Sequence, residues 1–203
     1  ILMHKDLPDQ LVFDNLVKLM YSDCGIGNDI AGELDYFKKV KQEEVVSFHA
    51  SHYHAKNFLV SVVGDFDFEE VKGLIKTYFD DKFNKKSKIK TKKWSKPSRV
   101  KPNVIFEKKD IAQSNILLGF KTLPYADFNR LKLALICFIL GGSMSSRLFQ
   151  KIRNELSLCY SVYAFDMNYR NNGFLGISLA TSASNQKNAI DAVNVEIDRI
   201  LHE

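Results

Sequence analysis

Apolar positions in the first part of the chain repeat with the period of a helix. Residues 8–21 keep one apolar face and begin at Pro8, which suits a first helical turn. Residues 42–53 predict a second helix. A third is predicted after Asp67, where apolar residues recur at i, i+3, i+4, i+7 and i+8: Val71, Leu74, Ile75, Tyr78 and Phe79. The continuous apolar run 58–63 before it predicts a buried strand.

The second half of the chain mixes strand and helix patterns. Strands are expected at 104–108 and 114–120, and a buried helix at about 127–140. Residues 159–169 alternate and predict a strand, residues 170–173 contain an Asn-Gly turn, and residues 174–181 are expected to form the returning strand of a β-hairpin. A last helix capped by Ser184 is expected, with an apolar face made of Ala189, Ile190, Val193, Ile197, Ile200 and Leu201.

The stretch between the apolar helix and the hairpin carries the densest signals. Gly141 and Gly142 break the apolar run. A short amphipathic helix is predicted next, with one face made of Leu148, Phe149, Ile152 and Leu156. Arg153 lies near the end of this segment and Tyr160 at the start of the following strand. A guanidinium and a phenol are therefore expected to converge at one helix–strand junction.

These patterns predict an α+β fold of two units joined by a linker. Residues 1–81 are interpreted as the C-terminal part of a first domain, and residues 103–203 as most of a second domain. The first unit is incomplete, because its helices have only one predicted strand to cover. Residues 82–102 are interpreted as the linker.

The charge of the chain is concentrated in that linker. Residues 82–101 contain ten Lys or Arg and no acid, which leaves −5 on the rest of a chain whose net charge is +5. The segment lacks periodicity and contains Pro97, as expected of an exposed basic linker. A nucleic-acid-binding arm is the alternative. No nucleic-acid fold signal accompanies it, so nucleic acid is not expected as a partner.

Hydropathy and cysteine usage restrict the class further. No apolar run approaches the roughly 20 residues that span a bilayer, so no membrane partner is expected. Cys24, Cys137 and Cys159 are widely spaced and odd in number, which favours structural thiols in a reducing compartment. A cytoplasmic location is the expectation, with the periplasm or an organelle left open.

Several motifs together resemble one enzyme family. Residues 141–149 read Gly-Gly-x-Met-Ser-Ser-Arg-Leu-Phe, followed by Ile152-Arg153 and Leu158-x-Tyr160-Ser161-Val162. Weaker matches keep the same order: Ile1-x-Met3, Asp6-x-Pro8-Asp9, Val12-Phe13-Asp14, then Gly27, Ile30 and Gly32, then Phe48, Tyr53, Asn57 and Val63-Gly64. The chain resembles the insulinase/pitrilysin family of zinc metallopeptidases, and within it the processing-peptidase-like subgroup. The resemblance implies that the two α+β units are related in fold, each an antiparallel-rich sheet covered by helices.

The resemblance places the zinc ligands outside this chain. The family's His-x-x-Glu-His motif and its downstream glutamate fall before Ile1 by register, and neither orientation of the motif occurs in the sequence. Zinc is thus expected for the full-length enzyme, with no metal ligand in this chain. His49, His52 and His54 suggest a metal site by spacing, but no Cys or close carboxylate completes one, and solvated side chains are expected instead.

The resemblance assigns roles to two residues, Arg153 and Tyr160. They match an Arg and a Tyr that reach the substrate backbone near the scissile bond in active members of the family. Arg153 would donate to a peptide carbonyl, and the Tyr160 phenol would hydrogen-bond the oxyanion. Arg147, earlier on the same helix, is expected to form a structural ion pair. Leu156 and Ser157 depart from the family, which often has a basic residue and a glycine there.

The implied function is part of a zinc-dependent metalloendopeptidase that hydrolyses peptide bonds of extended polypeptides in a closed chamber. This segment would supply substrate positioning and transition-state contacts. The implied partners are a polypeptide substrate and a second half of the enzyme, in a homodimer, in a heterodimer or in a longer chain. The alternative is a non-catalytic subunit of the same fold with a scaffolding role.

Overall fold

The computed structural model describes residues 3, 6–53, 57–83 and 103–202. The chain separates into two compact units, one made of Ile1–Gly32 with Trp94–Glu203 and the other of Glu33–Lys93.

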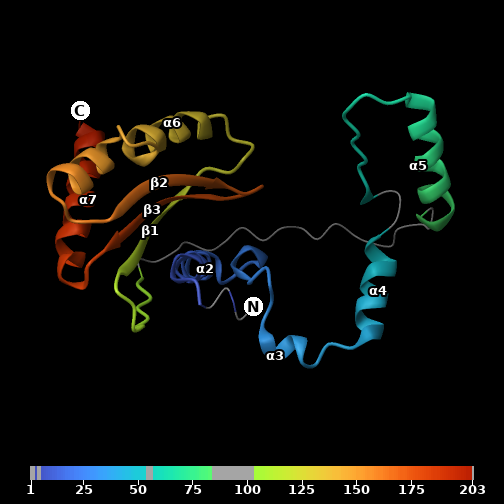
Figure 1. Ribbon diagram of the computed structural model, residues 1–203, viewed down its shortest axis with the longest axis horizontal. Helices are drawn as coiled ribbons and strands as arrows, with labels where there is room; N and C mark the ends of the chain where they lie inside the picture. Colours follow the sequence, from blue (N-terminus) through green and yellow to red (C-terminus); the bar gives the residue numbers. More distant parts are fainter. Residues whose placement is uncertain (1–2, 4–5, 54–56, 84–102, 203) are drawn as a thin grey trace. The chain divides into compact units, whose positions relative to one another are not determined.

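A three-stranded antiparallel sheet organises the first unit (Figure 1). Its strands are β1 (Ser114–Thr122), β2 (Ser161–Asn168) and β3 (Gly173–Thr181), in the order β1-β3-β2. The β2–β3 hairpin confirms the expectation from the Asn-Gly turn. β3 lies in the centre because β1 pairs with it along its whole length on the other side.

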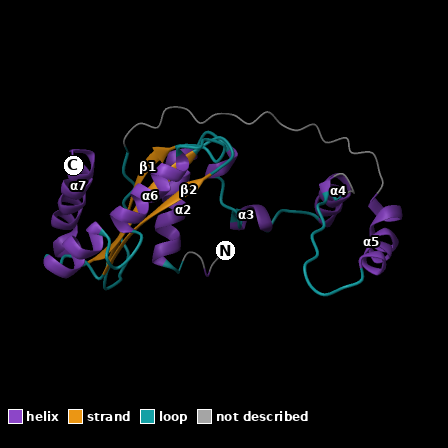
Figure 2. Cartoon of the chain, turned by 90° about the horizontal axis from the view of Figure 1, so that it is seen from above, coloured by secondary structure: helices purple, strands orange, loops and turns teal. Residues whose placement is uncertain are grey.

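Helices cover both faces of this sheet (Figures 1 and 2). α6 (Arg130–Gly141), η3 (Phe149–Glu155) and α7 (Gln186–His202) pack on one face, where the core contains Cys137, Leu140, Leu148, Ile152, Val162, Ala164, Leu175, Ile177, Leu179 and Val193. α2 (Pro8–Tyr21) packs on the other face, where the core contains Leu16, Val17, Met20, Tyr21 and Phe174. Successive β3 residues serve opposite faces, as strand geometry requires.

Close contact at Gly141 fixes the end of α6 on β2. A Cβ atom at this position would collide with the backbone nitrogen of Ala164 and lie 2.7 Å from its Cβ. The chain then leaves the sheet through Gly142 toward η3. Glycine is therefore needed here for close packing, in addition to ending the apolar run.

The apolar helix α6 is only partly buried, which corrects the expectation of a core helix. Cys137 and Leu140 are buried, whereas Leu131, Leu135 and Phe138 are 57–60% exposed. A helix on one side of a single sheet buries one face, and apolar composition alone does not indicate which face that is. In the part of the chain that the structure describes, no helix is long and apolar enough to cross a membrane.

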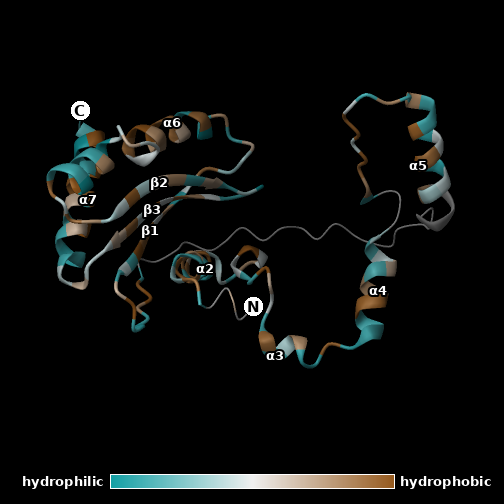
Figure 3. Ribbon diagram, viewed as in Figure 1, coloured by the Kyte–Doolittle hydropathy of each residue, from teal (hydrophilic) through white to brown (hydrophobic). Residues whose placement is uncertain are grey.

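The second unit is helical in its described residues. It contains α3 (Leu34–Phe37), α4 (Gln42–His52) and α5 (Phe68–Phe83), of which α4 and α5 were predicted. The Asp67 carboxylate caps the start of α5, because it accepts a 2.8 Å hydrogen bond from the Glu70 amide. Many apolar side chains in this unit remain exposed. The brown segments of Figure 3 mark where hydrophobic residues lie along its backbone.

Two predicted strands, 58–63 and 104–108, are wrong. Both segments are unpaired and exposed, with Leu59 and Val63 at 94%, Val104 at 84% and Phe106 at 78%. A strand needs neighbours for its N–H and C=O groups, and the described residues offer none at either place. The short-range pattern was strand-like, but pairing is a long-range property.

The other predictions have mixed outcomes. The α+β class is confirmed. A 3₁₀ turn, η4 (Ala183–Asn185), precedes α7, so Ser184 does not cap that helix, and its hydroxyl lies 3.1 Å from the Ser182 hydroxyl. Another 3₁₀ turn, η1 (Gly25–Gly27), follows α2.

The predicted domains, 1–81, 82–102 and 103–203, stay a prediction. Within the first unit, α2 packs against β1. Residues 84–102, which make up most of the predicted linker, lie outside the described residues.

Candidate functional site

The segment that carries Arg153 is a π-helix. η3 runs from Phe149 to Glu155, and the Leu156 amide donates to the Lys151 carbonyl, five positions back, at 3.0 Å. Leu148 and Ile152 are fully buried, but Leu156 is 44% exposed. The wider π turn rotates residue 156 away from the face that an α-helix would give it, which corrects the predicted apolar face. Such turns occur often at functional sites.

A tight turn reverses the chain between η3 and β2. Ser157 has φ = 52°, in the left-handed region, and the Leu158 amide donates a 2.9 Å hydrogen bond to the Ile152 carbonyl. A non-glycine residue in this conformation costs roughly 1–2 kcal/mol. The conformation gives a physical reason why glycine suits position 157.

The backbone of Tyr160 is held by a hydrogen bond to the sheet, and its side chain is exposed. Its amide donates a 2.7 Å hydrogen bond to the Ala180 carbonyl, just before the register pair Ser161–Ala180 begins the β2–β3 ladder. The side chain is 58% exposed. The phenol is therefore available to a ligand while its backbone is held by the sheet.

Arg153 is exposed at the other side of the same turn. Its guanidinium lies 4.7 Å from the centroid of the Phe149 ring. It also acts on the thiol of Cys159: burial raises the pKa of Cys159, and the positive charge of Arg153 opposes that rise. Arg153 thus lies near the residue that precedes Tyr160. The junction brings the two predicted site residues into one region, although Arg153 stacks on Phe149 rather than on Tyr160.

A buried carboxylate ties the residues just before η3 to α7. Glu196 is 2% exposed, and its two oxygens contact Arg147 Nε at 3.2 Å and Arg199 Nη1 at 2.9 Å. The expected structural ion pair of Arg147 is confirmed. Sequence reasoning missed Glu196, but a signal existed, because it falls on the apolar face of α7 between Val193 and Ile197.

Thr181 is a second residue that sequence reasoning missed. It is fully buried at the end of β3, and its hydroxyl donates a 2.6 Å hydrogen bond to the carbonyl of Leu158 in the turn. No local signal reveals this contact, since a threonine that ends an alternating strand is ordinary.

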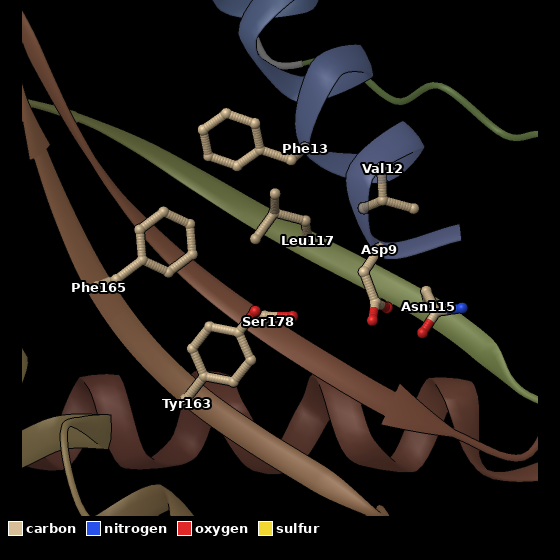
Figure 4. Close-up of a pocket in the computed structure, with 8 residues that line it drawn as sticks. All are labelled: Asp9, Val12, Phe13, Asn115, Leu117, Tyr163, Phe165 and Ser178. Carbon is tan, nitrogen blue, oxygen red and sulfur yellow. The ribbon is translucent and has the colours of Figure 1, made fainter. Parts of the chain in front are cut away.

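Two hollows in the described part of the first unit lie away from this pair. A cavity of about 30 Å³ lies under α2, between Asp9, Asn115, Ser178 and three aromatic rings (Figure 4). Its size suits about one water molecule. A shallow depression of about 420 Å³ between η3 and α7 is lined by Arg147, Gln150, Lys151, Glu155, Glu196 and Arg199. Neither contains Arg153 or Tyr160.

The described residues do not fit a zinc centre. No three His, Cys, Asp or Glu side chains among them are grouped so that they could hold a metal ion. Two histidines of the predicted His49, His52 and His54 group stack on aromatic rings instead. The ring centroids are 4.4 Å apart for His49 and Tyr53, and 4.0 Å apart for His52 and Phe48. His54 lies outside the described residues.

Comparison with known proteins identifies the family. Residues 39–203 match the model of the peptidase M16 inactive domain. An uncharacterised zinc protease of Rickettsia felis is 32% identical over 180 residues, which cover 88% of this chain and 42% of that protein. The chain therefore belongs to the peptidase M16 family, and the resemblance to insulinase/pitrilysin-type zinc peptidases is confirmed. It spans less than half the length of the relatives it matches.

Solved structures share the fold. The peptidase M16 inactive domain of Pseudomonas fluorescens superposes with a TM-score of 0.87 at 21% identity, covering 99% of this chain and 48% of that one. A chain of Complex III2 from Candida albicans, with Inz-5 bound, superposes with a TM-score of 0.73 at 12% identity, covering 89% of this chain and 44% of that one. At these identities the similarity supports the fold alone.

Proposed function

We propose that this chain is part of a zinc-dependent metalloendopeptidase that cleaves extended polypeptides in a closed chamber. Its contribution is to position the substrate and to contact the transition state. The observation that carries the proposal is the junction between η3 and β2, where Arg153 and Tyr160 present exposed side chains from a backbone held by hydrogen bonds.

The chemistry of the two side chains suits this role. A guanidinium donates several hydrogen bonds in a plane, which suits the carbonyls of an extended peptide. A phenol hydroxyl can donate to the oxygen that becomes negative as the carbonyl carbon turns tetrahedral. Both groups act through donors, so neither needs to gain or lose a proton in this role.

The zinc would come from a different part of the enzyme. The described residues offer no ligand set, so the metal-bearing half is a second subunit or another part of a longer chain. Naming of the relatives as zinc proteases supports a metal in the complete protein. When bound, zinc would supply Lewis-acid activation of the peptide bond. The residues of this chain would bind and orient the peptide.

Steady-state kinetics on the complete peptidase, with a quenched-fluorescence peptide, test the proposal. Tyr160→Phe is expected to lower kcat by on the order of a hundredfold with little change in KM, since the oxyanion exists only along the reaction path. Arg153→Ala is expected to raise KM as well, because it also binds the substrate before reaction. Melting temperatures should stay near that of the wild type, because both side chains are exposed.

Two matched variants control for surface changes. Tyr163→Phe removes the hydroxyl of a 48% exposed tyrosine on the same strand, and Arg170→Ala removes an exposed guanidinium from the hairpin loop. Both should keep wild-type kinetics. Wild-type kinetics for Tyr160→Phe and Arg153→Ala would remove the proposed role.

A second candidate is a non-catalytic subunit that supports a catalytic partner. The match to a domain family described as inactive favours it. In that case, loss of this chain would lower the stability of the partner, while Tyr160→Phe and Arg153→Ala would leave partner activity unchanged. Zinc analysis of the purified chain is common to both proposals, and about one zinc per chain would contradict both.

A further inference from the structure

We propose that Thr181 is a positioning residue that sets the spacing between Arg153 and Tyr160. The proposal rests on the proposed function, because it concerns how the same two side chains are aimed at a polypeptide substrate. It starts from one contact: the Thr181 hydroxyl donates to the Leu158 carbonyl at 2.6 Å.

The contact completes a continuous set of hydrogen bonds across the junction. On the η3 side, the Leu158 amide donates to the carbonyl of Ile152, the residue before Arg153, at 2.9 Å. On the β2 side, the Tyr160 amide donates to the carbonyl of Ala180, the residue before Thr181, at 2.7 Å. Neighbouring residues of β3 therefore hold Leu158 and Tyr160 at once. Leu158 in turn holds the end of the π-helix.

The turn needs such a support. It contains Ser157 in the left-handed region, and the exposed side chains of Leu156 and Ser157 do not hold it in place by packing. Leu158 and Cys159 pack against the core, and the Thr181 hydroxyl adds a directional contact to the Leu158 backbone. Thr181, in contrast, has no exposed surface and lies in the central strand, opposite Ser114 of β1. The hydroxyl thus links the end of the central strand to the turn that contains Ser157.

Positioning of this kind has a measurable effect on catalysis. A displacement of about 1 Å in a group that contacts the reacting atoms can lower the rate by on the order of a hundredfold. Thr181→Val keeps the shape of the side chain but removes the donor, so the Leu158 carbonyl loses this partner. Arg153 and Tyr160 would then be held less accurately relative to each other, without any change to their own chemistry.

The test compares Thr181→Val with Thr181→Ser and Ile177→Val in the complete peptidase. Thr181→Val should lower kcat by on the order of tenfold to a hundredfold, and KM should change less. Thr181→Ser keeps the donor and should recover most of the wild-type kcat. Ile177 is also fully buried in β3, and Ile177→Val removes core volume without removing a donor, so it should keep kcat while lowering the melting temperature.

Amide hydrogen exchange gives a readout that does not depend on activity. In Thr181→Val, the amides of Leu158 and Tyr160 should exchange about tenfold faster than the loss of global stability, measured on the slowest-exchanging amides, accounts for, and in Thr181→Ser they should not. If Thr181→Val does not fold, Thr181→Ala and Thr181→Ser provide the same comparison of donor absent with donor present.

The outcomes separate this proposal from the function on which it rests. Loss of kcat in Thr181→Val, with recovery in Thr181→Ser, supports it. A kcat as high as in Ile177→Val, while Arg153→Ala and Tyr160→Phe remain impaired, overturns it and leaves the proposed function standing. Faster exchange at Leu158 and Tyr160 with wild-type kinetics in all variants overturns the proposed function and reduces Thr181 to a structural role.

Discussion

Arg147 and Glu196 lie 49 positions apart in sequence and are joined by a 3.2 Å contact between Nε and Oε2. Glu196 belongs to α7, and Arg147 lies two residues before the π-helix. The second oxygen of the same carboxylate accepts a hydrogen bond from Arg199. One buried acid therefore connects the last helix of the chain to the segment that carries Arg153.

Replacing Glu196 by glutamine should lower the free energy of unfolding of the first unit by about 1–3 kcal/mol. The amide loses the charge that faces two guanidiniums, and its NH₂ group points a donor at another donor. Urea unfolding at neutral pH measures the change. Glu155→Gln is the control, because its 2.6 Å pair with Lys151 is largely solvated and should contribute about 0–1 kcal/mol. Equal losses in both variants would contradict this assignment.

Ser157→Gly should leave the unit as stable or stabilise it by up to about 1 kcal/mol. Glycine relieves the left-handed conformation at φ = 52° but has a larger entropy when unfolded, so the two effects partly offset each other. Ser157→Val should destabilise the unit, because β-branched residues fit this region worst. Thermal melts compare the two. Asn154→Gly, inside η3, serves as the control and should lower the free energy of unfolding by about 0.5–1 kcal/mol. A similar loss in Ser157→Gly would show that Ser157 is not strained.

Gly141→Ala should destabilise the first unit by about 1–3 kcal/mol, as overpacking does. The new methyl group would press against the Ala164 backbone, which cannot move without disturbing β2. Amide exchange in β3 provides the measurement. Gly73→Ala in α5 is the opposite case, because a Cβ added at this position has no neighbour within 4 Å. Alanine favours the helix more than glycine does, so the variant should show a higher helix content by circular dichroism. An unchanged stability in Gly141→Ala would show that α6 can shift away from β2.

The stability of the first unit should fall at high pH through Tyr21. Burial, and to a smaller extent Tyr169 and Cys24, raises the pKa of Tyr21 to about 12. Between about pH 10, the ordinary value, and pH 12, the unfolded chain loses this proton while the folded chain keeps it. The unfolded state then binds fewer protons, so the free energy of unfolding decreases as pH rises.

Tyr21→Phe separates this effect from others. At pH 7 it should cost about 1 kcal/mol, because the 3.0 Å hydrogen bond from the phenol to the Gly173 carbonyl is lost. By pH 11 the difference in free energy of unfolding between Tyr21→Phe and the wild type should shrink, because only the wild type loses stability through the ionisation of Tyr21. Burial also raises the pKa of Cys137 to about 11, but that thiol is present in both proteins and its effect cancels. A difference that widens with pH in urea unfolding would contradict the prediction.

The sequence predicted correctly those elements whose buried face repeats with a regular period along the chain or whose turn has a characteristic residue pair. The faces of α2 and α7 and the alternation in β3 follow from 3.6-residue and two-residue periods, and the turn between β2 and β3 from its Asn-Gly pair. The residues Arg153 and Tyr160 came from a family resemblance, and the structure places both at one junction. Their catalytic role stays a prediction.

Properties that depend on distant neighbours could not be predicted in this way. Val104 and Phe106 have a strand pattern, but the described part of the chain pairs no strand with them. Leu131 belongs to a helix as apolar as a core helix, yet its side chain is exposed among the described residues. Leu156 was placed on the wrong face because a single π turn changes the period. The contact from Thr181 to Leu158 joins residues 23 positions apart, so no sequence window contains its cause.

The exposed segment 58–63 has a consequence for how the chain behaves in concentrated solution. Its residues, Phe-Leu-Val-Ser-Val-Val, carry no charge and no proline and combine hydrophobicity with strand propensity. Such hexapeptides stack readily into cross-β fibrils when their backbone groups are unsatisfied. Soluble preparations of this chain should therefore depend on chaperones or on a subunit that supplies an adjoining strand, and a lysine at Val60 would act as a gatekeeper against fibril growth.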